Sequence, residues 1–168
     1  MHFDEEFEEI YHEHSDKIFR FIYLHTQDFY LSEDFTSEVF LKAWKNWEKF
    51  KPDFTKAWLY KIANNLLIDY WRNNKNKKKI SLEIMVEEGI EPSYDEDLIE
   101  KIQKDETIKK INNALKELPK NLKDVAILRF IEGLSSKESG EILKLSEGNI
   151  RVLQHRALVK LKEILKNG

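Results

Sequence analysis

The chain of 168 residues is 41% hydrophobic and 35% charged, with 5 glycines and 3 prolines, a composition typical of helical proteins with short turns rather than of sheet-rich folds. It has no cysteine, which excludes disulfides and thiolate metal sites, and no apolar run near the roughly 18 residues that span a bilayer. Its acidic start lacks the basic opening of a signal peptide. We therefore expect a cytoplasmic protein.

Charge along the chain is arranged in blocks. Counted as Lys and Arg against Asp and Glu, residues 1–41 carry a net −9, residues 42–79 a net +8, residues 80–107 a net −8 and residues 108–168 a net +6. Two basic blocks separated by an acidic one indicate two separate contacts with polyanions. Solvated helix faces are the alternative explanation of this pattern.

Two amphipathic helices are predicted at the start of the chain. Apolar and aromatic side chains recur every three or four residues from Phe7 to His25. The same spacing recurs in a second run that ends near Phe50. We expect the second helix to start near Ser32, which forms half of a capping box with Phe35 three residues later, and to end near Phe50.

A third helix is predicted over residues 54–72. Because proline fixes its own φ and suits the first turn of a helix, Pro52 marks the break before it. We expect one side of this helix to carry Phe54, Trp58, Ile62, Leu66 and Tyr70. The helix runs into a tract from Arg72 to Lys79 that is too polar and too charged to pack, so this tract must face solvent or an anion.

An acidic connector over residues 80–107 separates this part of the chain from the second half. It contains Gly89 and Pro92, and we interpret it as an interdomain linker. The expected fold is therefore all-α, with two small helical domains. Residues 1–79 would form three or four helices and residues 108–168 would form four.

The second half carries clear helix start and stop signals. Its first helix is expected to stop at Pro119, and its second to end at Gly133, the usual left-handed residue beyond a helix. Ser135 and Glu138 form a capping box that opens a short helix, and Ser146 caps the final long helix. The inner face of this last helix is expected to carry Ile150, Leu153, Ala157, Leu161 and Ile164.

The segment 134–160 has helix-turn-helix spacing, with a capped short helix, a tight turn and a longer helix. In such a unit the second helix lies in the major groove, where Arg pairs with guanine and Asn with adenine. A plain helical hairpin with a solvated face is the alternative. The side chains expected to project outward and read bases are Glu147, Asn149, Arg151, Val152, His155 and Arg156.

Aromatic side chains are interleaved with cations on the helix over residues 54–72. Single-stranded nucleic acid fits such a pattern, because bases stack on rings while phosphates meet charge. The alternative is that Trp58 is structural and that the amides only cap or are solvated. The residues that suggest this site are Trp58, Asn64, Asn65, Trp71 and Arg72, with Lys56 and Lys61.

Together these segments resemble a known family. The segments from Asp34 to Trp44 and from Lys56 to Leu66 resemble the conserved second region of sigma factors of the extracytoplasmic-function type, within the sigma-70 family. The segment from Leu118 to Leu161 resembles their fourth region. The similarity covers nearly the whole chain. It implies an alternative sigma factor, not an enzyme, that binds core RNA polymerase, directs it to specific promoters and promotes melting of the DNA.

The resemblance also implies roles for individual residues. The helix over residues 147–163 would read the minus-thirty-five element, and the acidic linker would pass through the active-site and RNA-exit channel of the polymerase. Other expected partners are the polymerase flap, for the C-terminal domain, and an anti-sigma factor; no cofactor or metal is expected. The residues that would bind the clamp helices of the largest polymerase subunit are Asp34, Glu38, Leu41 and Trp44. Those that would bind the minus-ten element and its flipped base are Phe50, Lys51, Asp53, Phe54, Trp58, Lys61, Asn65 and Arg72.

The chain departs from the family pattern at a few positions. Val152 and Leu153 stand where the family often has polar or basic residues, and Gly140 stands in the first motif helix where alanine is common. We expect that helix to form nevertheless, because one internal glycine costs about 1 kcal/mol.

Two other functions are alternatives to this one. A DNA-binding regulator with a ligand-sensing first half would explain the helix-turn-helix but not the Trp-rich helix. A metal-dependent hydrolase would use His12, His14 and His25 with Glu9 and Glu13. However, His12 and His14 are two residues apart and so point about 200° apart on a helix, which disfavours the enzyme. We expect His14 at an interface and His12 in solvent.

Overall fold

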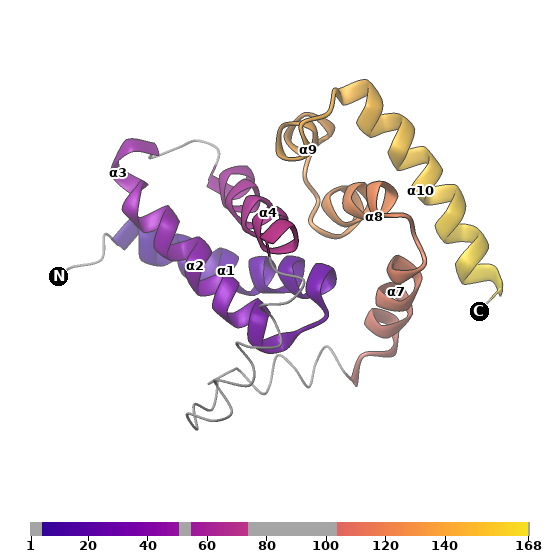
Figure 1. Cartoon of the computed structure of the whole chain (residues 1–168), viewed down its shortest axis with the longest axis horizontal. Helices are drawn as coiled ribbons and strands as arrows, with labels where there is room; N and C mark the ends of the chain where they lie inside the picture. Colours follow the sequence, from indigo (N-terminus) through magenta and orange to yellow (C-terminus); the bar gives the residue numbers. More distant parts are fainter. Residues whose placement is uncertain (1–4, 51–54, 74–103, 168) are drawn as a thin grey trace. The chain divides into compact units, whose positions relative to one another are not determined.

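The computed structural model describes residues 5–50, 55–73 and 104–167. The chain divides into two compact units, Met1–Asp95 and Glu96–Gly168, and we describe each by itself as the N-terminal and the C-terminal unit. In both units the described residues form helices joined by short turns, with no strand among them (Figure 1). The predicted all-α class is confirmed. Most of the predicted linker and of the basic tract lies outside the described residues.

The described residues of the N-terminal unit form four helices, α1 (Glu5–Thr26), α2 (Phe29–Lys45), the short α3 (Trp47–Phe50) and α4 (Thr55–Asn73). The three long helices pack on one another. Their interface excludes apolar and aromatic side chains from water, which is the main favourable contribution to folding. Fully buried members of this core are Ile18, Phe21, Ile22, Val39, Ala43, Leu59, Tyr60 and Leu67.

The start of α2 differs from the prediction. The cap is Asp28, whose Oδ1 accepts a hydrogen bond from the Leu31 backbone N–H at 3.1 Å. Ser32 is buried inside the helix, and its hydroxyl donates to the Asp28 carbonyl at 2.6 Å. The predicted start near Ser32 was therefore wrong, because a serine hydroxyl can bond back to the preceding turn as well as cap a helix. At the other end α2 stops at Lys45, before α3, rather than near Phe50.

The inner face of α4 is also rotated from the predicted one. Leu59, Tyr60, Ala63 and Leu67 are almost fully buried. Of the described side chains predicted for that face, Leu66 is buried, and Trp58, Ile62 and Tyr70 are half-buried. The predicted stripe therefore runs along the edge of the buried face.

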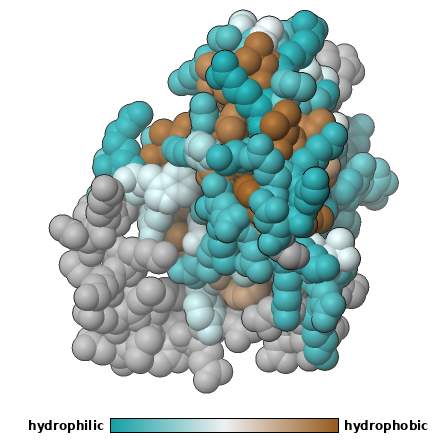
Figure 2. Space-filling view, turned by 90° about the vertical axis from the view of Figure 1, so that its right-hand side faces the viewer, coloured by the Kyte–Doolittle hydropathy of each residue, from teal (hydrophilic) through white to brown (hydrophobic). Residues whose placement is uncertain are grey.

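The C-terminal unit contains α7 (Glu106–Lys116), α8 (Lys120–Ala126), the π-helical turn η1 (Ile127–Ile131), α9 (Ser136–Leu143) and α10 (Glu147–Asn167). Helix α10 packs on α7, α8 and α9. Figure 2 views the molecule from the side of α7 and α10, and shows a mostly hydrophilic surface with apolar patches. The exposed large apolar residues of α10 are Val152, Leu158, Val159 and Leu165.

The end of the helix that begins at Lys120 is wider than an α-helix. The Glu132 backbone N–H donates to the carbonyl of Ile127, five residues earlier, at 2.9 Å, which is the pattern of a π-turn. Gly133 follows with φ of +70°, so the predicted left-handed glycine is confirmed. The π-turn was not predicted, because the apolar pattern from Leu122 to Ile131 fits an ordinary helix equally well.

Candidate nucleic-acid interfaces

The capping box predicted before α9 is present in full. The Glu138 backbone N–H donates to Ser135 Oγ at 3.0 Å, and the Ser135 N–H donates to Glu138 Oε1 at 2.9 Å. The N-terminus of α10 is capped as predicted, because the Asn149 N–H donates to Ser146 Oγ at 3.1 Å. These bonds satisfy backbone donors that each helix end leaves open, and they fix where both helices of the motif begin.

The turn between these two helices depends on two backbone features. Lys144 adopts the left-handed conformation, with φ of 60°. The Leu145 N–H then donates to the carbonyl of Gly140 at 2.9 Å. A Cβ on Gly140 would lie 2.5 Å from the Leu145 carbonyl oxygen, closer than atoms can pack. An alanine at this position would force the turn to shift, so the turn as it stands favours glycine over the alanine that is common in the family.

All six side chains predicted to project from the recognition helix α10 are exposed: Glu147, Asn149, Arg151, Val152, His155 and Arg156. Arg151 Nη2 donates to Glu147 Oε2 at 3.2 Å, one turn earlier. Both of these side chains remain largely exposed, at 68% and 47%. An exposed pair of this kind contributes little to stability, so Arg151 can exchange its partner for a DNA acceptor at low cost.

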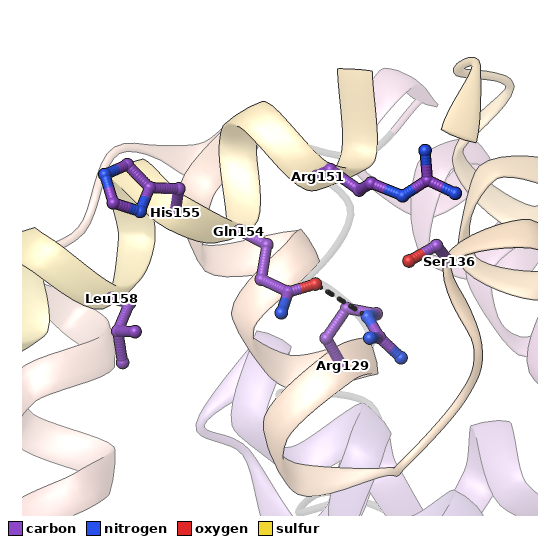
Figure 3. Close-up of a pocket in the computed structure, with 6 residues that line it drawn as sticks. All are labelled: Arg129, Ser136, Arg151, Gln154, His155 and Leu158. Atoms are coloured by element: carbon purple, nitrogen blue, oxygen red, sulfur yellow. Dashed lines mark hydrogen bonds between the residues drawn. The ribbon is translucent and has the colours of Figure 1, made fainter. Parts of the chain in front are cut away.

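Arg129, at the π-turn, connects the parts of the motif. Its Nε donates to Gln154 Oε1 on α10 at 2.8 Å, and its Nη1 donates to the Leu134 carbonyl in the loop before α9 at 2.5 Å. Figure 3 shows the Gln154 side chain directed at the guanidinium group. A cavity of about 320 Å³ lies beside this contact and is lined by Arg129, Ser136, Arg151, Gln154, His155 and Leu158.

Arg129 was not among the residues predicted from the sequence. The available signal was a cation within the otherwise apolar run from Leu122 to Ile131. A charged side chain in such a run needs a partner, but the partner, Gln154, lies 25 positions away. Only the packing of α10 on α8 brings the two together.

The residues predicted on α4 to contact single-stranded DNA share one face. At about 100° per residue, Trp58, Lys61, Asn65 and Arg72 fall within about 60° of the helix circumference. Lys61, Asn65 and Arg72 are exposed and Trp58 is half-buried. We call these four residues, together with Asp69, the α4 stripe. The stripe lies opposite the buried face of the helix. It therefore presents two cations, an amide, a carboxylate and part of an indole to solvent.

The two neighbouring asparagines of α4 differ in access. Asn64 is buried, with 7% of its surface exposed, whereas Asn65 is exposed. Of the two amides that the sequence offered, only Asn65 is accessible to a base. Trp71 contacts the ring of His25 on α1, with centroids 6.0 Å apart, so it takes part in packing within the unit.

Several predicted residues of the same site cannot be located. Lys51, Asp53 and Phe54 lie outside the described residues, as does the side chain of Phe50, the last residue of α3. Their expected role at the minus-ten element therefore stays a prediction.

The residues predicted to bind polymerase lie along α2. Asp34, Glu38 and Leu41 are exposed, with Leu41 at 53%, and fall within about 60° of the helix circumference. Partial burial, and to a lesser extent the charge of Asp28, raises the pKa of the Asp34 carboxyl. Trp44 is half-buried because its ring packs on Phe7 of α1, with centroids 5.0 Å apart. The face thus combines an exposed apolar side chain with two carboxyl groups.

The histidines of α1 do not form a metal site. His12 is exposed, as predicted, and lies 3.8 Å from Glu8, and His14 is buried, with 7% of its surface exposed. Burial is the main cause that lowers the pKa of His14. Within the described ranges no three His, Asp or Glu side chains are grouped so as to hold a metal ion. In the same ranges no helix is long and apolar enough to cross a membrane.

Comparison with known proteins agrees with this arrangement. The family model "Sigma-70 region 2" matches residues 10–77, and "Sigma-70, region 4" matches residues 114–163. The ECF RNA polymerase sigma factor SigM of Bacillus subtilis is 27% identical over 96% of this chain and 96% of its own length. The ECF RNA polymerase sigma factor BldN of Streptomyces coelicolor is 29% identical over 95% of this chain and 60% of its own length.

A solved structure has the same fold. The sigma factor RpoE, in complex with the anti-sigma factor NepR from Bartonella quintana, aligns with a TM-score of 0.73 at 20% identity. The alignment covers 97% of this chain and 98% of that one.

Proposed function

Because this chain belongs to the sigma-70 family and is an RNA polymerase sigma factor of the extracytoplasmic-function type, we propose which of its surfaces bind polymerase and which bind promoter DNA. The chain is an alternative sigma factor. It binds core RNA polymerase, directs it to specific promoters and promotes melting of the DNA at initiation. We assign residues 1–79 to polymerase and minus-ten binding, 80–107 to a linker, and 108–168 to minus-thirty-five binding.

The helix-turn-helix of the C-terminal unit would bind the upstream element as duplex. The observation that supports this is the capped α9–α10 pair with all six predicted reading side chains exposed. Arg129 and Arg151 add positive charge beside the N-terminal turns of α10, where phosphates of the groove edge would lie. Arg151 can form two hydrogen bonds to a guanine once it releases Glu147.

The α4 stripe would bind the separated strand at the minus-ten element. Trp58 offers a ring face, Asn65 an amide that can bond a base edge, and Lys61 and Arg72 charge for the backbone. Extrusion of a base costs a few kcal/mol, and contacts of this kind can repay that cost without ATP. Phe50, Lys51, Asp53 and Phe54 complete the proposed site.

The α2 face would bind the clamp helices of the largest polymerase subunit. Leu41 is the exposed apolar contact, and Asp34 and Glu38 flank it with carboxyl groups that suit a basic partner. Trp44 extends this surface toward α1. The C-terminal unit would contact the flap of the polymerase.

Further assignments follow from the family. Known sigma factors of this fold are bound by anti-sigma proteins, as in the RpoE–NepR complex, and we propose that an anti-sigma factor regulates this chain too. We also propose that it acts in the cytoplasm, where its polymerase works, and that it catalyses no reaction of its own. A free-standing regulator would leave the α4 stripe without a role.

The first experiment mixes the purified full chain with bacterial core polymerase that lacks sigma and follows both by gel filtration at moderate salt. Co-elution is expected. Arg151→Ala should co-elute equally well but lose on the order of 1–3 kcal/mol in promoter recognition at the upstream element. If the chain binds promoter duplex tightly alone and never binds an active, matched core, it is a regulator and the assignment is wrong.

A further inference from the structure

Val152 lies on the side of the recognition helix α10 that faces away from the rest of the unit. Buried Ile150 and Ala157 mark the side of α10 that packs on the rest of the unit. At about 100° per residue, Val152 points about 160° away from Ile150 and about 140° away from Ala157. The residue is 48% exposed, so it projects away from the body of the unit.

Polar side chains flank this valine on both sides. Arg151 and His155 line the cavity beside α9 (Figure 3). Asn149 and Arg156 are exposed, and Asn149 points about 160° away from Arg151 around the helix. When α10 enters the major groove, the flanks can bond phosphates and base edges while the valine faces the floor of the groove.

The local structure also holds the valine in a defined position. Gly148, one turn earlier on the same side, has no side chain, and an added Cβ there would meet nothing nearer than Ser146 Oγ at 4.0 Å. A β-branched residue in a helix has one strongly preferred χ1 rotamer. The two methyl groups therefore have little conformational freedom to lose on binding.

The chemistry of the groove then limits what Val152 can recognise. In the major groove guanine, cytosine and adenine present hydrogen-bonding groups, and only thymine adds a methyl group. A valine against a polar edge would remove water without replacing its hydrogen bonds. We propose that Val152 reads the C5-methyl group of a thymine in the upstream promoter element. This inference rests on the proposed role of α10 and adds one base preference to it.

The test uses holoenzyme, assembled from the full chain and core polymerase, and a duplex promoter library randomised over the upstream element. Selection by wild-type holoenzyme should enrich thymine at one position, and Val152→Ala should lose that enrichment. In the selected promoter, deoxyuridine at that position removes the methyl group and preserves base pairing. It should weaken binding about fourfold, which corresponds to about 0.8 kcal/mol for one apolar carbon.

Val159→Ala is the matched control, because Val159 is 45% exposed on the same helix but beyond its first three turns. This variant should keep both the thymine enrichment and the loss on deoxyuridine substitution, whereas Val152→Ala should bind the thymine and deoxyuridine promoters equally. If wild type enriches an upstream sequence but no deoxyuridine substitution weakens binding, Val152 does not read a methyl group. If no upstream sequence is enriched at all, the proposed role of α10 itself is wrong.

Discussion

Arg129 Nε donates a hydrogen bond to Gln154 Oε1 at 2.8 Å, and this bond joins the π-turn to the recognition helix. The same guanidinium bonds the Leu134 carbonyl in the loop that leads into α9. One side chain thus ties together the three segments whose relative positions define the motif. We therefore expect the angle at which α10 is presented to DNA to depend on this contact.

Arg129→Ala should therefore lower both stability and upstream recognition. Loss of two hydrogen bonds from a charged donor, one of them to a backbone carbonyl, should cost about 1–3 kcal/mol. The measurement is the midpoint of thermal unfolding of the full chain, with promoter affinity of the holoenzyme beside it. Arg156→Ala, at an exposed position, should weaken DNA binding but leave the midpoint nearly unchanged. Equal midpoints for both variants would show that Arg129 has no positioning role.

Gly140→Ala should destabilise the turn of the motif. The new Cβ would meet the Leu145 carbonyl oxygen at 2.5 Å, and a backbone atom cannot rotate aside. We expect a loss of about 1–3 kcal/mol in the free energy of unfolding. Gly148→Ala is the control, because its nearest neighbour is 4.0 Å away and alanine favours a helix over glycine by up to about 1 kcal/mol. Unfolding in denaturant should move the two variants in opposite directions; a stabilised Gly140→Ala would contradict the clash.

Local signals in the sequence predicted the motif well. The Ser135–Glu138 capping box, the Ser146 cap and the left-handed Gly133 are all confirmed. Each depends on residues within three or four positions of one another, so side-chain chemistry alone is sufficient to place it. For the same reason the exposed face of α10 could be deduced from helical periodicity.

Features that depend on packing could not be predicted in this way. Ser32 has the chemistry of a cap, but Asp28 takes that place and Ser32 is buried. The predicted inner face of α4 was rotated from the observed one because the apolar pattern counts Trp58 and Tyr70 as inward residues. In the structure α1 and α2 pack on α4, and Leu59 and Ala63 are the residues buried there.

Asn65→Ala should impair promoter opening without unfolding the protein. Asn65 is exposed on the α4 stripe, so its removal should cost little stability but lose one amide contact to the flipped base. Permanganate reactivity of minus-ten thymines in the holoenzyme–promoter complex measures the open fraction. Asn64→Ala should behave differently, because that amide is buried and its loss should lower the unfolding midpoint. An unchanged open fraction and base preference in Asn65→Ala would indicate that this residue does not read a base.

Leu41→Asp should weaken binding to core polymerase. The leucine is 53% exposed, so the substitution should not unfold α2, but it would place a charge in an apolar contact. An interface anchor of this kind is typically worth more than about 1 kcal/mol, and we expect at least a several-fold loss of affinity in a fluorescence titration with core. Val159→Asp introduces the same charge at a similarly exposed position of the other unit and should bind core normally. Equal affinity of the two variants would place the polymerase contact elsewhere.

Asp124 on α8 should make stability depend on pH between about 4 and 6. Burial raises the pKa of its carboxyl from 3.8 to about 6, against the smaller opposing effects of Lys120 and Lys123. A raised pKa means that the folded state favours the protonated form. This group therefore disfavours folding progressively as pH rises through that window, by on the order of 2–3 kcal/mol once it is ionised in both states.

Asp124→Asn removes this titration while keeping the size of the side chain. Relative to wild type, the variant should therefore gain stability as pH is raised from 4 to 7.5, and most of the gain should occur below pH 7. Urea unfolding at several pH values measures the difference. Glu141→Gln, at an exposed position of α9, is the control for the replacement of a carboxyl group by an amide. A difference in stability between Asp124→Asn and wild type that stays constant with pH would mean that Asp124 titrates alike in the folded and unfolded chain.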